Sequence, residues 1–125
     1  MSASGLSTPT LARFKRVLRE RRALDAEEAS TLAASMGDVL SARADGQADD
    51  EHDPEGPTLS FEWSRLDAVQ REAAADLHAV DAALSRLADG TFGVCARCGR
   101  PIGIDRLNAR PTAELCIDCA RLISG

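Results

Sequence analysis

Residues 95–119 read CARCGRPIGIDRLNARPTAELCIDC, and this stretch decides how the C-terminal part of the chain folds. It holds the four cysteines of the chain as two pairs, Cys95/Cys98 and Cys116/Cys119. Two C-x2-C pairs at this separation are a strong signal for one tetrahedral zinc site. Because all four thiolates serve as ligands, no position stays open for a catalytic water, so we expect one structural Zn²⁺ ion. A redox switch is the alternative, since oxidation of the thiolates would release the metal.

The rest of the C-terminal part offers little apolar material for a core. The large apolar side chains of residues 91–94 and 99–115 are Phe92, Val94, Ile102, Ile104, Leu107 and Leu115. This is too little for a stable small domain without a staple, so we expect the metal to fold residues 91–125. We expect a positive φ at Gly99. We also expect Thr112 to cap a short last helix that carries the second cysteine pair and ends near Leu122 or Ile123.

Composition limits the classes of protein to which the chain can belong. It has 125 residues, a formal net charge of −5, 44% hydrophobic residues and 3% aromatic residues. The size fits one domain or a small two-part assembly, and an apolar set dominated by alanine and leucine favours helices. The negative charge disfavours a freely basic nucleic-acid binder. The sequence shows no glycine-rich phosphate loop and no Ser/His/Asp set, so we expect no enzymatic activity.

The sequence also bears on location. No segment has the roughly 20 apolar residues that a membrane-spanning helix needs, and the first residues lack the pattern of a secretory signal. We therefore expect a cytoplasmic protein without a membrane partner. In that reducing setting, paired C-x2-C motifs are metal ligands rather than disulfides.

We expect a flexible N-terminus over residues 1–8 and then a long helix over about 9–43. Thr8 is placed to cap this helix, with Pro9 at its first position. Apolar residues recur along the helix at steps of mostly three or four. They are Leu11, Phe14, Val17, Leu18, Leu24, Ala29, Leu32, Met36, Val39 and Leu40. Such a stripe needs a partner surface.

A second helix over residues 61–89 has the clearest periodicity of the chain. We expect Ser60 to cap it and Gly90 to end it as a left-handed residue. Its stripe alternates steps of three and four for nearly four heptads and is broken only by Gln70. The stripe consists of Trp63, Leu66, Gln70, Ala73, Leu77, Val80, Leu84 and Leu87.

The segment over about 44–58 is rich in glycine, proline and acids, so we expect a loop there. Since neither helix buries its stripe alone and the connection is short, the two helices are expected to pair. The predicted fold is all-α dominated: a long antiparallel α-helical hairpin (coiled coil) over 9–90 with an acidic tip loop, followed by a four-cysteine zinc finger over 91–125. Pairing of the same stripes between chains is the alternative, but the loop length favours a monomer.

The sequence from Asp89 to Ala120 resembles the zinc-finger signature of the DksA/TraR family of bacterial transcription regulators. The matching pieces are D-G-T-F-G-x-C-x-x-C-G, P-I-G-x-x-R-L-x-A-R-P-T-A and L-C-I-D-C. The resemblance implies a regulator that binds RNA polymerase, inserts its hairpin into the secondary channel and thereby modulates transcription initiation. The alternatives are a zinc-stabilised protein–protein adaptor and a DNA-binding zinc-ribbon factor. No recognition-helix pattern appears, so sequence-specific DNA binding is not expected.

In this family the acidic tip approaches the magnesium ion of the polymerase active site. The candidate tip residues here are Asp49, Asp50, Glu51, Asp53 and Glu55. The best-studied tips carry an Asp-x-x-Asp-Ala element, whereas here Asp50 and Asp53 keep the spacing and Pro54 replaces the alanine. A solvated loop that keeps the hairpin soluble is the alternative role. The second helix has no Lys or Arg between Arg71 and Arg86, where alarmone-responsive members place cations, so alarmone binding is not expected.

Overall fold

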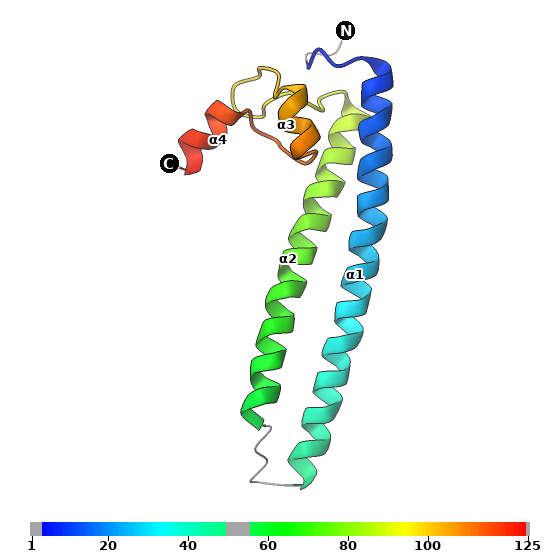
Figure 1. The fold of residues 1–125 in the computed structure, drawn as a ribbon, viewed down its shortest axis with the longest axis vertical. Helices are drawn as coiled ribbons and strands as arrows, with labels where there is room; N and C mark the ends of the chain where they lie inside the picture. The colour runs from blue at the N-terminus through cyan, green and yellow to red at the C-terminus, as the bar shows by residue number, and fades with distance from the viewer. Residues whose placement is uncertain (1–3, 50–55, 125) are drawn as a thin grey trace. The chain divides into compact units, whose positions relative to one another are not determined.

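A computed structural model describes residues 4–49 and 56–124. Over these residues it contains four helices, α1 (Thr8–Asp49), α2 (Gly56–Asp89), α3 (Ile104–Ala109) and α4 (Ile117–Ser124), and no strand longer than one bridge (Figure 1). The predicted all-α fold, with two long paired helices before a four-cysteine module and a short last helix, is confirmed. None of the helices in the described ranges is long and apolar enough to cross a membrane.

The chain forms two compact units, and each contains a part of both long helices. The finger unit joins the chain up to Ala23 with the chain from His78 onward, and the helix-pair unit spans Leu24–Leu77. The zinc module expected to begin at residue 91 therefore does not stand alone, because it shares one compact unit with the ends of α1 and α2.

Within the finger unit the two long helices are antiparallel. Arg22 of α1 donates a hydrogen bond to Asp81 of α2, whereas Phe14, two turns earlier on α1, contacts Phe92 just beyond the end of α2. In the helix-pair unit Met36 and Val39 of α1 and Ala73 of α2 are buried. All members of the expected α2 stripe are buried or half-buried.

The expected stripe of α1 is wrong at two positions. Leu24 is 66% exposed and Leu40 is 51% exposed. The stripe instead passes through Arg21 and Asp25, which are half-buried. These two positions continue the three- and four-residue steps that begin at Leu18. Burial along α1 therefore follows the helical period and not the polarity of each side chain.

The helix ends differ from the prediction. Ser7 caps α1, because its Oγ accepts the backbone N–H of Thr10 at 3.3 Å, so the cap lies one residue before the expected Thr8. α1 continues to Asp49 and α2 begins at Gly56, so both helices extend into the stretch expected as a loop, and Ser60 lies inside α2. A single glycine in a helix interior destabilises the helix by only about 1 kcal/mol relative to alanine. When alanine and glutamine, which favour helices, lie next to the glycine, the helix continues through it. The acids Asp50, Glu51, Asp53 and Glu55 lie outside the described residues, as does the side chain of Asp49.

The end of α2 forms as predicted. Gly90 has a φ of 80°. The N–H of Thr91 donates to the carbonyl of Arg86 at 2.9 Å and the N–H of Gly90 to that of Leu87 at 3.4 Å. This is the Schellman pattern, which satisfies carbonyls that the helix leaves free.

Residues 4–7 differ from the expected flexible terminus. Ser4 is buried, and Leu6 packs against the core. Both side chains lie over Gly93, where an added Cβ would come within 2.9 Å of Leu6 Cδ1 and Ser4 Cβ. A glycine with a φ of 83° is what allows this close approach.

Candidate metal centre

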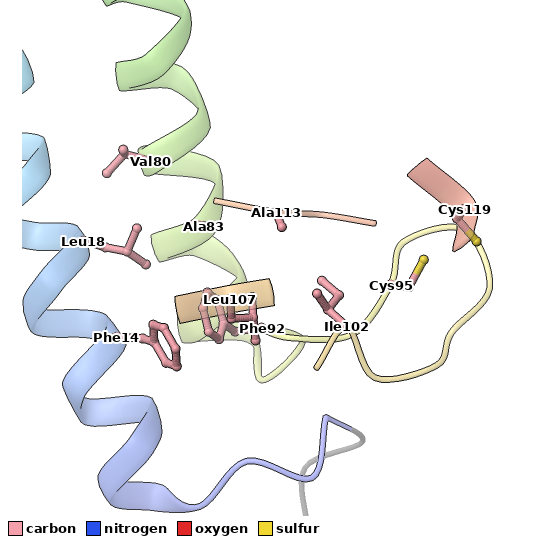
Figure 2. Packing of buried hydrophobic residues seen from close by; sticks show 10 residues of the cluster. All are labelled: Phe14, Leu18, Val80, Ala83, Phe92, Cys95, Ile102, Leu107, Ala113 and Cys119. Atoms are coloured by element: carbon pink, nitrogen blue, oxygen red, sulfur yellow. The ribbon is translucent and has the colours of Figure 1, made fainter. Parts of the chain in front are cut away.

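One hydrophobic cluster connects the long helices to the cysteines, as Figure 2 shows. It consists of Phe14, Leu18, Val80, Ala83, Phe92, Cys95, Ile102, Leu107, Ala113 and Cys119. Two of the four cysteines therefore belong to the core itself. The apolar material that the finger lacks comes from α1 and α2, so the metal and the helices together provide its core.

A tight turn holds the first cysteine pair. Val94 and Pro101 form an antiparallel bridge at its base, and the N–H of Cys95 donates to the carbonyl of Arg100 at 2.8 Å. The N–H of Gly99 donates to the carbonyl of Cys95 at 2.9 Å. Gly99 has a φ of 75°, which confirms the predicted left-handed residue after the pair.

The second pair lies at the start of α4. Cys116 immediately precedes the helix, Cys119 lies in its first turn, and the N–H of Ala120 donates to the carbonyl of Cys116 at 2.9 Å. The predicted cap at Thr112 is wrong, because α4 begins only at Ile117. The residues from Thr112 to Leu115 instead form a non-helical segment that brings Cys116 to the first pair.

The four sulfur atoms gather at one point. They all lie within 4.8 Å of one another, and the Sγ atoms of Cys98 and Cys116 are 3.8 Å apart. A tetrahedron with zinc–sulfur bonds of about 2.3 Å has edges of about 3.8 Å. None of the four forms a disulfide. The donor chemistry and the spacing thus fit one zinc ion bound by Cys95, Cys98, Cys116 and Cys119.

The pKa values of two of these thiols move in opposite directions. Burial alone would raise the pKa of Cys95, but backbone hydrogen bonds from Cys116, Cys98 and Arg97 outweigh it and lower that pKa to about 6. Burial, together with the other three sulfurs, raises the pKa of Cys119 to about 12. Without a cation, the thiolate form is favoured at Cys95 and disfavoured at Cys119, and a bound cation would favour the thiolate form of Cys119.

Sequence reasoning missed α3 and two arginines that support the site. Arg106 of α3 donates from Nε to the carbonyl of Leu115 at 2.8 Å, and Arg86 of α2 donates from Nη2 to the carbonyl of Thr112 at 3.4 Å. Six residues are too few for a helical period to stand out. Arg106 lies inside the matched motif, which is the one signal that could have drawn attention to it.

Comparisons with known proteins agree with this geometry. Residues 90–124 match the prokaryotic dksA/traR C4-type zinc finger family. The chain is 36% identical over 110 residues to the RNA polymerase-binding transcription factor DksA of Haemophilus influenzae. This alignment covers 87% of this chain and 70% of that protein. It is 34% identical over 113 residues to the protein of the same name from Escherichia coli K12, covering 90% of this chain and 70% of that protein.

A solved structure shows the same fold. The structure of transcription factor DksA2 from Pseudomonas aeruginosa aligns with a TM-score of 0.80 at 22% identity. The alignment covers 99% of this chain and 90% of the other.

Proposed function

The chain belongs to the DksA/TraR zinc-finger family, and from this membership we propose that it binds RNA polymerase and regulates transcription initiation. One observation carries the proposal. The likeness to the polymerase-binding relatives extends over 87% of the chain and so includes the long helices. A match confined to residues 90–124 would support zinc binding alone.

In this proposal the paired helices α1 and α2 enter the secondary channel of the polymerase. The acids Asp49, Asp50, Glu51, Asp53 and Glu55 then approach the magnesium ion of its active site. The family resemblance and the density of carboxylates in this segment support this role, since carboxylate oxygens are ligands that magnesium accepts.

The zinc ion has a structural part in this function. The four thiolates leave no coordination position for a substrate or a water, so the finger provides a fixed surface and no chemistry. We propose that the protein is not an enzyme, that it acts in the cytoplasm as a monomer, and that it does not respond to an alarmone.

Binding to purified core RNA polymerase tests the proposal, because it needs no promoter. The zinc-loaded protein is immobilised and its binding to core enzyme and to holoenzyme is measured at several salt concentrations. Saturable binding to both, with none to promoter DNA alone, is the expected result. Absence of binding to either form of the enzyme contradicts the proposal. Binding to DNA alone that weakens steeply with salt would instead support a zinc-ribbon factor.

In vitro transcription provides the second step. Adding the protein to polymerase and a set of promoters should change the yield of initiated transcripts. Binding without any effect on initiation would favour the adaptor function over regulation.

A further inference from the structure

The two cysteine pairs are held in place by different means. The first pair has its own support, since the bridge between Val94 and Pro101 and the backbone bond from Cys95 to Arg100 close the turn around it. At the second pair, the N–H of Ala120 donates to the carbonyl of Cys116 at the start of α4, and a backbone hydrogen bond from Cys116 reaches the Cys95 thiol. The position of the second pair relative to the first also depends on the segment before it, residues 112–115.

Four hydrogen bonds attach this segment to the rest of the finger unit, and one of them runs from the N–H of Ala113 to the carbonyl of Arg110 at 3.0 Å. The N–H of Ala96 donates to the carbonyl of Glu114 at 2.8 Å, between the two cysteine-bearing segments. Arg106 donates to the carbonyl of Leu115 at 2.8 Å. Arg86 donates to the carbonyl of Thr112 at 3.4 Å, at the long limit for such a bond. Of the two side-chain donors, Arg106 has the shorter bond and the acceptor nearer to a ligand.

The donor itself is anchored. Arg106 is half-buried, and the next residue, Leu107, is fully buried in the core. The N–H of Leu107 donates to the carbonyl of Gly103 and that of Arg110 to the carbonyl of Arg106, which fixes the helical turn. The guanidinium thus extends from a rigid element to the residue directly before Cys116.

We propose that Arg106 is a positioning residue for the zinc site. Its bond to Leu115 keeps Cys116, and with it Cys119, within reach of the metal held by the first pair. The charged donor gives a stronger hydrogen bond than a neutral one, and its loss leaves the carbonyl of Leu115 without this partner. Groups that orient metal ligands in this way commonly change metal affinity by about 10- to 100-fold. The inference rests on zinc binding and is independent of the polymerase.

Zinc release from the full-length protein tests the proposal. Arg106→Met keeps the length of the side chain and removes the donors, and Arg106→Lys keeps the charge and one donating group. Release is followed with an excess of a coloured chelator. We expect Arg106→Met to release zinc about tenfold to 100-fold faster than the wild type and Arg106→Lys to lie between the two.

Arg110→Met is the matched control. Arg110 is exposed and belongs to the same motif, and its side chain forms no hydrogen bond within the described residues. It should release zinc within about twofold of the wild type. Equal acceleration by the Arg106 and Arg110 variants would show an effect of net charge and would overturn the proposal, as would a rate for Arg106→Met within twofold of the wild type.

The order of thiol labelling separates positioning from general stability. Zinc-loaded protein is treated with iodoacetamide and the labelled cysteines are identified by mass spectrometry. In Arg106→Met, labelling of Cys116 and Cys119 should increase relative to Cys95 and Cys98. A proportional increase at all four cysteines would indicate loss of the whole fold and would contradict a positioning role. If Arg106→Met does not fold, Arg106→Lys decides the question by the same two measurements.

Discussion

Phe14 and Phe92 pack with ring centroids 5.3 Å apart and planes inclined by 45°. Phe14 lies on α1, Phe92 lies three residues after the end of α2, and each of the two residues is 1% exposed. The pair joins the start of the first long helix to the cysteine-bearing turn through contacts that the metal does not make. The finger unit is therefore stabilised from two sides, by the zinc site and by this aromatic contact.

Replacing Phe92 with alanine should destabilise the finger unit strongly. The substitution empties the centre of the cluster between α1 and the first cysteine pair, and Phe→Ala changes in cores cost about 3 to 5 kcal/mol. Urea unfolding of the zinc-loaded protein, followed by circular dichroism, measures the change. The control is Phe61→Ala, since Phe61 is 73% exposed. The expectation fails if both variants change the free energy of unfolding by the same amount.

The spacing of residues close together in the sequence predicts the features of the fold that depend on neighbouring residues. The alternation of three- and four-residue steps from Trp63 to Leu87 was enough for α2 and its buried face. Gly90 marked the end of that helix, because an achiral residue takes a positive φ without strain. The spacing of the cysteines predicted that Cys95, Cys98, Cys116 and Cys119 meet, which the structure confirms.

Long-range packing was not accessible in the same way. The bond from Arg13 to the side chain of Asn108 and the packing of Ser4 over Gly93 join residues far apart in the chain. Local spacing carries no signal for such contacts. The α1 stripe passes through Arg21 and Asp25 in place of Leu24. Side-chain polarity alone points to Leu24, whereas the helical period determines which positions face the partner helix.

Substitution of Gly93 by alanine tests the packing of the N-terminal segment. An alanine Cβ would lie 2.9 Å from atoms of Leu6 and Ser4, and the φ of 83° adds backbone strain. Gly90→Ala is the matched control, because Gly90 has a φ of 80° and open space around the added Cβ. Both variants should lose about 1 kcal/mol from strain. Gly93→Ala should lose more and should release residues 4–7, seen as faster proteolysis there. Equal losses would show that the contact contributes nothing.

Removal of the metal should affect the two units unequally. Cys98→Ser takes away one ligand at the exposed edge of the site, so we expect loss of zinc and of the ordered structure after Gly90. Since the helix-pair unit Leu24–Leu77 has buried residues of its own, it should remain helical. Hydrogen exchange resolved by peptide measures the protection of the two units separately. Removal of zinc from the wild type with a chelator should give the same pattern. Unchanged protection after Gly90 in metal-free protein would show that zinc is not needed for the fold.

Zinc affinity should increase with pH. The metal binds thiolates, and in the metal-free site the pKa of Cys119 is about 12, so this thiol releases a proton on binding at any pH near neutrality. The pKa of Cys95 is about 6, so this thiol is already ionised at pH 7 and contributes an additional released proton only below about pH 6. The affinity should therefore fall more steeply with each pH unit below 6 than above it. Competition with a chelator between pH 5 and 8 measures the slope, and a flat dependence would contradict the assigned charges.

The acidic segment between the long helices gives the most direct test of how the protein acts on the polymerase. The test variant replaces Asp49, Asp50, Glu51 and Asp53 with alanine. The control variant makes the same change of net charge at exposed acids of α1, namely Glu20, Glu27, Glu28 and Asp38. If the segment acts at the active-site magnesium, the test variant should bind core polymerase as well as the wild type does and lose the effect on initiation. The control variant should keep both polymerase binding and the effect on initiation. If the test variant affects transcription as the wild type does, these acids only maintain solubility.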